Sequence, residues 1–284
     1  MRLSTLDIGG LAIKSAVFED GVLENFAEIP TRTDLGAAWL LRTAAAIAEG
    51  HRPDAIGIAI RGQVDHAAGT LIYDATYEDY CNLPVKAALE SYLRLPVAVE
   101  NDANCAALAE GRLGAAQGFE SYLCLTLGSG IGGAMVLDGK LWRGRNHLAG
   151  EFGLMAFPGD DPLSDTWEQY AATSALLYKA GLLGLGITDG HSLLAARHHP
   201  RVAALLARWA RDVAFGLRTL IHSFDPPCLV LGGGLMSRPE LFALVEHTTH
   251  ASLSPGYAPV IRPAALGTRA GLWGAYLMAD GGKP

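Results

Sequence analysis

The residues best suited to chemistry in this sequence are glycines that follow strand-like segments. Gly9 and Gly10 come directly after Asp7 and Ile8, so their backbone amides could approach a phosphate group while the Asp7 carboxylate holds hydrated Mg²⁺. The same D-x-G-G pattern occurs in ordinary tight hairpins, where glycine pairs are standard turn residues. Taken alone, this segment leaves a phosphate site and a structural turn both open.

Two further glycine clusters favour the phosphate interpretation. Residues 128–133 place four glycines and one serine hydroxyl between two strand-like segments, although a structural turn needs only one or two glycines. Residues 229–234 follow a strand and precede a helix expected from about residue 237, so their amides could face a nucleotide at a helix N-terminus. We therefore expect the nucleotide to be bound by Asp7, Gly9, Gly10, Gly128, Ser129, Gly130, Gly232, Gly233 and Gly234.

Asp102 is the candidate for proton transfer. It follows Glu100 and Asn101 at the end of a strand expected at 97–99, just before a helix expected at 103–113. In isolation this carboxylate could be a helix N-cap, because Asp and Asn are favoured there. In a cleft that also binds phosphates, it could instead be the general base that accepts the proton of an attacking hydroxyl.

Glu151 and Glu168 are candidate sugar ligands. A carboxylate accepts two hydroxyl hydrogen bonds, and the neighbouring Phe152 and Trp167 can pack on a sugar face. Solvated loop acids would give the same pattern, so both interpretations stay open. The nine histidines show no ligand spacing, and we assign no metal site to them.

The elements that must position these residues alternate as in an α/β domain. The first half is expected to form strands at 3–8, 12–18, 22–29, 55–60 and 97–99 and helices at 37–49, 85–93 and 103–113. The second half is expected to form strands at 122–127, 133–137 and 228–231 and helices at 166–180, 191–196, 200–223 and 267–278.

Both halves open with a β-turn-β unit that carries glycine in the turn. Such a repeat predicts duplicated domains that face each other across a cleft, with both glycine turns on one ligand. We expect a small α/β domain of residues 1–103 together with a C-terminal helix at 266–284, and a large α/β domain of residues 104–265.

Composition excludes several classes of function. Of the 284 residues, 50% are hydrophobic and 18% are charged, which is typical of a compact globular chain. A net charge of −7 without any Lys/Arg run argues against nucleic acid or a membrane as partner. The four cysteines form no C-x-x-C pair, and no stretch reaches the about 18 apolar residues of a membrane span, so we expect a cytoplasmic protein.

Several short segments make the chain resemble the ROK family of bacterial sugar kinases and repressors over essentially its whole length. Residues 7–10 are similar to the family's D-x-G-G-T phosphate loop, and residues 61–65 to its G-x-V-D turn. Residues 100–110 are similar to its E-N-D-A-N-x-A-A-L-x-E segment, which is the most specific match. Residues 127–133 and 231–234 resemble its second phosphate loop and its adenosine-side glycines.

The resemblance implies the two-domain actin-like ATPase, or ribonuclease H-like, α/β fold and an ATP-dependent kinase of a hexose or hexose derivative. ATP and Mg²⁺ are the implied cofactors, with Asp7 holding the magnesium through water. In that family the aspartate matched by Asp102 is the catalytic base and the asparagine matched by Asn101 binds the sugar, while Glu168 resembles a sugar-binding glutamate. The expected partners are a small-molecule sugar and ATP, and a homodimer would be in keeping with the family.

The sequence departs from the family pattern at three places. The E-x-G-H motif ends here in Leu154, and residues 158–165 carry none of the cysteines that bind zinc in the family together with that histidine. Losing all ligands together indicates a metal-free loop, so no structural zinc is expected. Leu11 also replaces the usual threonine after D-x-G-G, which removes a hydroxyl near the phosphates.

Two other functions stay open. Because Leu11 and Leu154 alter family positions, the chain could be a catalytically weak sugar- or nucleotide-binding pseudokinase or a sugar-responsive regulator. A repressor is not expected, since Asp7 stands too near the N-terminus for a helix-turn-helix domain to precede it. An actin- or chaperone-like ATPase would share the fold but not the segment at 100–104.

Overall fold

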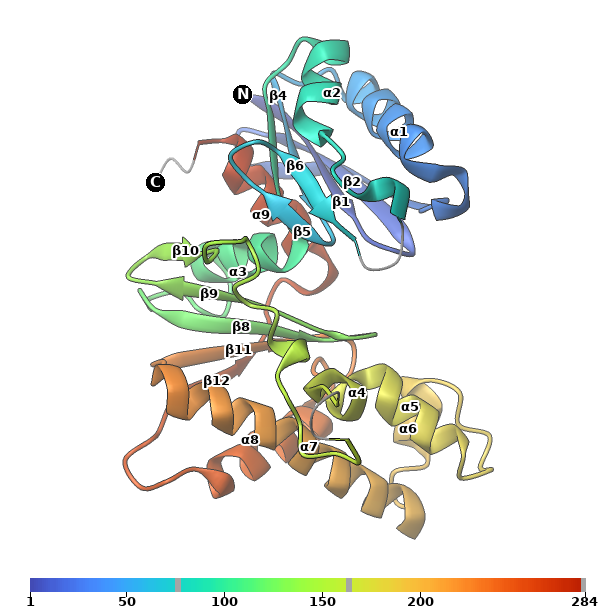
Figure 1. Ribbon diagram of the computed structural model, residues 1–284, viewed down its shortest axis with the longest axis vertical. Coiled ribbons are helices and arrows are strands. Elements are labelled where there is room, and N and C mark those ends of the chain that lie inside the picture. Colours follow the sequence, from blue (N-terminus) through green and yellow to red (C-terminus); the bar gives the residue numbers. More distant parts are fainter. Residues whose placement is uncertain (75–77, 162–164, 282–284) are drawn as a thin grey trace. The chain divides into compact units, whose positions relative to one another are not determined.

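The computed structural model describes residues 1–74, 78–161 and 165–281 (Figure 1). The chain forms two compact units: unit 1 contains Met1–Arg112, Gly144–Leu148 and Thr268–Pro284, and unit 2 contains Leu113–Arg143 and Ala149–Gly267. The domain boundaries expected from the sequence stay a prediction. Residues 162–164 of the cysteine-free loop and 282–284 of the expected C-terminal helix lie outside the described residues.

Unit 1 is built on a five-stranded sheet with the order β3-β2-β1-β4-β7. β2 is antiparallel to β1 and β3, whereas β1, β4 and β7 are parallel. The carboxyl ends of these three parallel strands therefore lie at one edge of the sheet. The strands are β1 (Arg2–Ile8), β2 (Ala12–Glu19), β3 (Val22–Pro30), β4 (Ala55–Ile60) and β7 (Val97–Asn101).

The sequence of β4, A-I-G-I-A-I, explains how both faces of this sheet are covered. Ile56, Ile58 and Ile60 share one face and pack in a core with α1 (Gly36–His51) and α2 (Val85–Leu93). The small residues of β4 face the opposite side, where α3 (Asp102–Leu113) and α9 (Ala270–Ala279) approach closely. Figure 1 shows α1 and α2 on one side of the sheet and α9 on the other.

Unit 2 repeats this plan with a sheet of order β10-β9-β8-β11-β12. β9 is antiparallel to β8 and β10, whereas β8, β11 and β12 are parallel. The same order and directions in both sheets are what the duplicated plan read from the sequence requires. The strands are β8 (Tyr122–Leu127), β9 (Ile131–Leu137), β10 (Lys140–Trp142), β11 (Cys228–Gly232) and β12 (Val260–Pro263).

The core of unit 2 lies between this sheet and a helical layer. Alternate residues of β8 and β11, such as Leu125 and Leu229, pack with Trp209 and Leu217 of the long helix α7. Figure 1 shows α7 and α8 along one face of the sheet. The helices of the layer are α4 (Trp167–Ala171), α5 (Thr173–Gly181), α6 (Gly190–Ala195), α7 (Pro200–Phe224) and α8 (Pro239–Ser252).

The single helix expected at 166–180 is wrong, because the structure divides it into α4 and α5. Ala172 is extended, with φ −63° and ψ 155°, and ends α4. The indole nitrogen of Trp209 donates a 2.8 Å hydrogen bond to the carbonyl oxygen of Ala171 at the break. This hydrogen bond from α7 compensates for the interrupted helical ladder, a tertiary contact that helix periodicity cannot reveal.

Smaller elements complete the described chain. The segment after β4 forms a hairpin of β5 (Gln63–Asp65) and β6 (Thr70–Tyr73). Four short 3-10 helices are η1 (Thr33–Leu35), η2 (Glu78–Tyr80), η3 (Phe152–Leu154) and η4 (Gly267–Arg269). Within the ranges that the structure describes, no helix combines the length and the apolar character needed to cross a bilayer.

Candidate active site

Parallel pairing brings the first glycine turn and Asp102 to one edge of the unit 1 sheet. Ile8 at the end of β1 pairs with Ile60 at the end of β4, and Ile60 pairs with Asn101 at the end of β7. The next residues along each strand, Gly9, Arg61 and Asp102, therefore follow in the same order across the edge. With neighbouring strands about 4.8 Å apart, Gly9 and Asp102 are separated by about two strand spacings.

Asn101, and not Asp102, caps helix α3. The Asn101 Oδ1 accepts a 3.0 Å hydrogen bond from the amide of Asn104, which is the N-cap pattern. Its Nδ2 donates to the Gly62 carbonyl oxygen at 3.0 Å and to Asp102 Oδ1 at 3.1 Å. Asp102 is therefore not the helix cap that the sequence left possible. Its carboxylate lies in the first turn of α3.

Glu100 stabilises the first turn of α3 with its buried carboxylate, a role that was not predicted from the sequence. Its side chain is fully buried, and Oε1 accepts hydrogen bonds from the Asn101 amide at 2.9 Å and from Asn104 Nδ2 at 3.0 Å. His66 Nδ1 lies 3.7 Å from Glu100 Oε2. A buried carboxylate surrounded by donors holds the backbone that carries Asp102 in one conformation.

Asp7 lies near the end of β1 with a lysine opposite. Lys14 is its register partner on β2, and Lys14 Nζ is 3.3 Å from Asp7 Oδ2. Burial raises the pKa of Asp7 above its ordinary value, while the charge of Lys14 and its hydrogen bond act in the opposite direction. The spacing from Asp7 to Lys14 across the hairpin was a signal in the sequence that could have identified this cation.

The tip of the hairpin carries the departure at Leu11. This side chain is 91% exposed, and the Gly9 amide is used to close the turn on the Ala12 carbonyl oxygen at 3.0 Å. Thr31, which follows β3, donates its hydroxyl to the Gly9 carbonyl oxygen at 2.8 Å. Thr31, which is distant in sequence, therefore supplies a hydroxyl beside this turn, where Leu11 has none.

The second glycine turn, between β8 and β9, is supported by Glu168. The Glu168 Oε2 accepts a 3.0 Å hydrogen bond from the amide of Ile131. A Cβ atom on Gly153 would come within 2.5 Å of the Ile131 carbonyl oxygen, so glycine is required there, whereas a Cβ atom on Gly130 would come within 2.6 Å of Glu168 Oε2 and displace that side chain. Glu168 thus supports the turn in addition to the sugar-binding role expected for it.

The start of α5 holds the same turn from another side. Thr173 Oγ1 donates to the Leu127 carbonyl oxygen at 3.1 Å, and the hydroxyl of Ser174 donates to the Ser129 carbonyl oxygen. These contacts fix the backbone of residues 127–129, including Gly128 and the predicted phosphate ligand Ser129. Rigid backbone amides can bind an anion without first losing conformational entropy.

Glu151 lies near Glu168 in unit 2. Desolvation of its carboxyl group, followed by the negative charge of Glu168, raises the pKa of Glu151 above its ordinary value. The residue that ends its motif, Leu154, is 58% exposed. The negative charge of Glu168 therefore acts on the other predicted sugar-binding carboxylate, and an apolar side chain stands at the position of the missing histidine.

The third glycine cluster lies at the same sheet edge as the second. β11 is parallel to β8, and Gly232 pairs with Thr126 one residue before Leu127. Gly233 and Gly234 then begin the connection to α8, and Ser237 Oγ donates to the Gly234 carbonyl oxygen at 2.9 Å. Both clusters predicted to face the nucleotide in unit 2 thus lie at neighbouring strand ends.

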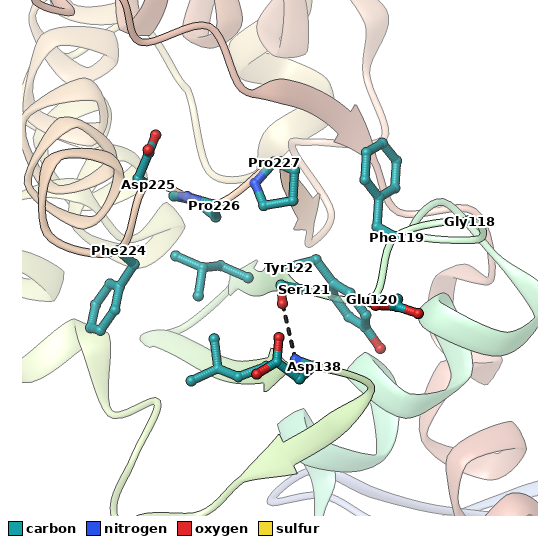
Figure 2. Close-up of a pocket in the computed structure, with 12 residues that line it drawn as sticks. Gly118, Phe119, Glu120, Ser121, Tyr122, Asp138, Phe224, Asp225, Pro226 and Pro227 are labelled. Carbon is teal, nitrogen blue, oxygen red and sulfur yellow. Dashed lines mark hydrogen bonds between the residues drawn. The ribbon is translucent and has the colours of Figure 1, made fainter.

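A pocket of about 520 Å³ lies at the opposite end of the unit 2 sheet (Figure 2). It is lined by residues at the start of β8, the end of β9 and the segment before β11, where Ser121 Oγ accepts a hydrogen bond from the Asp138 amide. The lining residues include the acidic Glu120, Asp138 and Asp225, whose negative charge would repel a phosphate. This pocket contains none of the predicted site residues.

A magnesium ion fits the first glycine turn through Asp7. Carboxylate oxygen is the ligand type that Mg²⁺ prefers, and the ion commonly keeps several of its waters. Because Lys14 Nζ lies 3.3 Å from Oδ2, a cation bound directly to that oxygen would be repelled, which favours contact through water. In the described ranges, no three His, Cys, Asp or Glu side chains gather as a metal-binding group.

Residues 3–281 match the model of the ROK family. The chain belongs to the ROK family. Beta-glucoside kinase of Listeria monocytogenes is 34% identical, over 97% of this chain and 96% of its own. The crystal structure of the ROK hexokinase from Thermus thermophilus is 34% identical with a TM-score of 0.85, and covers 99% of this chain and 98% of its own.

A third ROK relative is a glucokinase from Streptomyces griseus, solved in complex with glucose and AMPPNP. It is 31% identical with a TM-score of 0.83, and covers 99% of this chain and 100% of its own. These likenesses confirm the family and the two-domain actin-like ATPase fold predicted from the sequence. The relatives are kinases of sugars, in agreement with the predicted enzyme class, whereas the roles of individual residues stay predictions.

Proposed function

We propose that this ROK protein transfers the γ-phosphate of ATP to a hydroxyl group of a hexose or a hexose derivative. The observation that supports this best is the edge of the unit 1 sheet, where the glycine turn after β1 and Asp102 after β7 flank the end of β4. Phosphoryl transfer needs a phosphate-binding turn and a base for the attacking hydroxyl on one rigid frame.

Asp102 is the general base in this proposal. The sugar hydroxyl oxygen attacks the γ-phosphorus, and a new O–P bond forms while the bond from that phosphorus to the β–γ bridging oxygen breaks. The electron pair of the broken bond leaves with ADP, and the hydroxyl proton passes to Asp102 and then to solvent. Asn101 and Glu100 keep the Asp102 backbone in place through the hydrogen bonds at the start of α3.

The nucleotide phosphates would be bound by backbone amides of the glycine turns, because the chain has a net charge of −7 and offers no general attraction to anions. Lys14 would add a local positive charge beside Asp7. Asp7 would hold the magnesium ion through water, and the ion would offset phosphate charge when bound. A cytoplasmic location and a homodimer are further parts of the proposal.

The sugar would be bound by Asn101, Glu151 and Glu168. Two carboxylates whose charges influence each other can accept several hydroxyl hydrogen bonds, which suits a ligand with adjacent hydroxyls. The relatives named above act on a β-glucoside and on glucose, so both classes belong in any substrate test. The exposed Leu154 offers an apolar contact in place of an imidazole, which favours a substrate with an apolar or substituted position.

A catalytically weak sugar- or nucleotide-binding protein is the second candidate function. It is favoured by the 91% exposed Leu11 at the tip of the first glycine turn, where the family pattern has a hydroxyl. Thr31 beside that turn argues in the other direction, because its hydroxyl lies within hydrogen-bonding distance of Gly9.

The deciding experiment measures ADP release from Mg-ATP with a panel of hexoses, N-acetylhexosamines and β-glucosides. Release that depends on one sugar class is expected, and Asp102→Asn should lower turnover at least about a hundredfold while keeping the fold. Tight binding of sugar or nucleotide without release would favour the second candidate. Near wild-type turnover of Asp102→Asn would remove the base assignment.

A further inference from the structure

Arg61 occupies the middle of the sheet edge that carries the proposed chemistry. It directly follows β4, whose last residue Ile60 pairs with Ile8 on one side and with Asn101 on the other. The Arg61 backbone therefore lies between the glycine turn after β1 and the base after β7. Neither neighbour in that row, Gly9 or Asp102, carries a positive charge.

A buried carboxylate clamps one edge of the Arg61 guanidinium. Nε donates to Asp74 Oδ2 at 3.2 Å, and Nη2 donates to Asp74 Oδ1 and Oδ2 at 3.0 Å. The Asp74 side chain is 4% exposed and that of Arg61 is 41% exposed. This two-pronged contact fixes the plane and direction of the guanidinium, which a single contact would not do.

The Nη1 atom of Arg61 lies against the first glycine turn. A Cβ atom on Gly10 would come within 2.6 Å of Arg61 Nη1, so only glycine leaves room for this approach. A small recess of about 10 Å³, which is room for a single water-sized group, is lined in part by Gly9, Gly10, Thr31 and Arg61. The guanidinium is thus aimed at the turn that is proposed to receive phosphate.

We infer that Arg61 contacts the terminal phosphoryl group of the nucleotide and stabilises the negative charge that develops during its transfer, with Asp74 as the residue that positions Arg61. The fixed guanidinium lies between the phosphate-binding turn and the base. It can therefore stabilise the negative charge of the phosphoryl group as that group passes from ATP to the sugar oxygen. This inference rests on the proposed kinase function.

Equilibrium binding tests the inference without requiring turnover. Calorimetric titration of AMPPNP and of ADP into the protein and its Arg61→Ala variant separates contacts to the terminal phosphate from contacts to the rest of the nucleotide. We expect AMPPNP binding to weaken about tenfold or more, the usual scale for a lost charge-assisted hydrogen bond, with ADP binding changed much less. Equal losses for both nucleotides, or no loss, would overturn the inference.

Two further variants keep the result interpretable. Arg61→Ala leaves the Asp74 carboxylate buried without its guanidinium, which threatens the fold, so the double variant Arg61→Met with Asp74→Asn removes both charges together. The double variant should show the same selective loss for AMPPNP. Arg2→Ala is the matched control, because Arg2 pairs with Glu19 at 2.6 Å at the start of β1, at the opposite edge of the sheet from Gly9 and Arg61.

Turnover kinetics distinguish a catalytic role of Arg61 from a purely structural one. Arg61→Ala should lower kcat by about 10²-fold or more, as for loss of one preorganised donor to a transition state, with the sugar KM little changed. Asp74→Asn should give a smaller fall in kcat. A merely structural role predicts instead a lower Tm and a raised sugar KM with kcat preserved, which would overturn the inference.

A wild-type protein that releases no ADP with any sugar would refute the kinase proposal, while the two titrations would still decide whether Arg61 contacts the terminal phosphate.

Discussion

Asn101 and Asp102 are neighbours in sequence, yet the structure gives them different tasks. Either residue type can cap a helix, and the sequence left capping and catalysis both open for Asp102. The hydrogen bond from the Asn104 amide to Asn101 Oδ1 assigns the cap to Asn101. The assignment depends on side-chain geometry and on Gly62, a residue 39 positions away, which accepts from Asn101 Nδ2.

At the same scale, the pair of carboxylates in unit 2 should make sugar use depend on pH. The pKa of Glu151 is raised, chiefly by desolvation and then by Glu168, so Glu151 takes up a proton at a higher pH than a glutamate with the ordinary value of 4.5. If the ionised carboxylate binds sugar hydroxyls, kcat/KM for the sugar should fall as the pH is lowered, and the fall should begin at a higher pH than a glutamate with the ordinary pKa would give.

Glu168→Gln tests this coupling. The change removes the neighbouring charge but keeps an oxygen that can accept from the Ile131 amide, so the pKa of Glu151 should come down and the inflection of kcat/KM should move to lower pH. Glu120→Gln, in the pocket at the other end of the sheet, should leave the inflection unchanged. An inflection that stays in place or moves upward in Glu168→Gln would contradict the assignment.

At the scale of elements, close helix packing depends on single glycines. A Cβ atom on Gly274 of α9 would come within 2.0 Å of the Cys105 carbonyl oxygen in α3, and that backbone atom cannot move aside cheaply. Alanine is normally better than glycine in a helix by about 1 kcal/mol, but an overlap of this kind costs about 1–3 kcal/mol or more. Gly274→Ala should therefore destabilise unit 1, measured as a lower free energy of unfolding in urea.

Gly50 in α1 is the matched control. A Cβ atom there meets nothing within 4 Å, so Gly50→Ala should leave stability unchanged or raise it by up to about 1 kcal/mol. If Gly274→Ala were as stable as Gly50→Ala, α9 would not be packed on α3 as described.

Most elements followed from local patterns, because periodicity and turn residues are properties of short segments. β4 and α2 begin and end where the sequence places them, at 55–60 and 85–93. The break between α4 and α5 was missed because it depends on a hydrogen bond from Trp209, 38 residues away, to the Ala171 carbonyl oxygen. No local signal in residues 166–180 records that partner.

At the scale of the whole molecule, the chain returns at its end to the unit in which it began. Leu272 of α9 is fully buried in a cluster with Leu3, Phe18 and Ala55. Phe18 also stacks on Tyr276 with ring centroids 4.5 Å apart and contacts Trp273 edge-on at 4.7 Å. The sequence predicted this return, and the apolar character of the segment explains it.

Truncation after Leu266 should therefore unfold unit 1 and leave unit 2 folded. Each large apolar side chain of α9 contributes about 1.5–3 kcal/mol when fully buried, and several together approach the whole net stability of about 5–15 kcal/mol of a domain. Hydrogen exchange should show loss of protection in β1 and β4 with protection retained in β8 and β11. Retained protection in β1 and β4 would contradict the prediction, and an added peptide of residues 267–281 should restore it.

By itself, the sequence determined the α/β class, the repeated β-turn-β units and the positions of the glycine turns, because each is encoded in residues close together along the chain. The tertiary structure alone decided which residue caps α3, which partner Arg61 takes and where α4 ends. Those outcomes depend on groups brought together from distant segments, such as Asn101 with Gly62 and Ala171 with Trp209. Their hydrogen bonds form only once the sheet order has fixed the neighbours, and that is the information a linear pattern lacks.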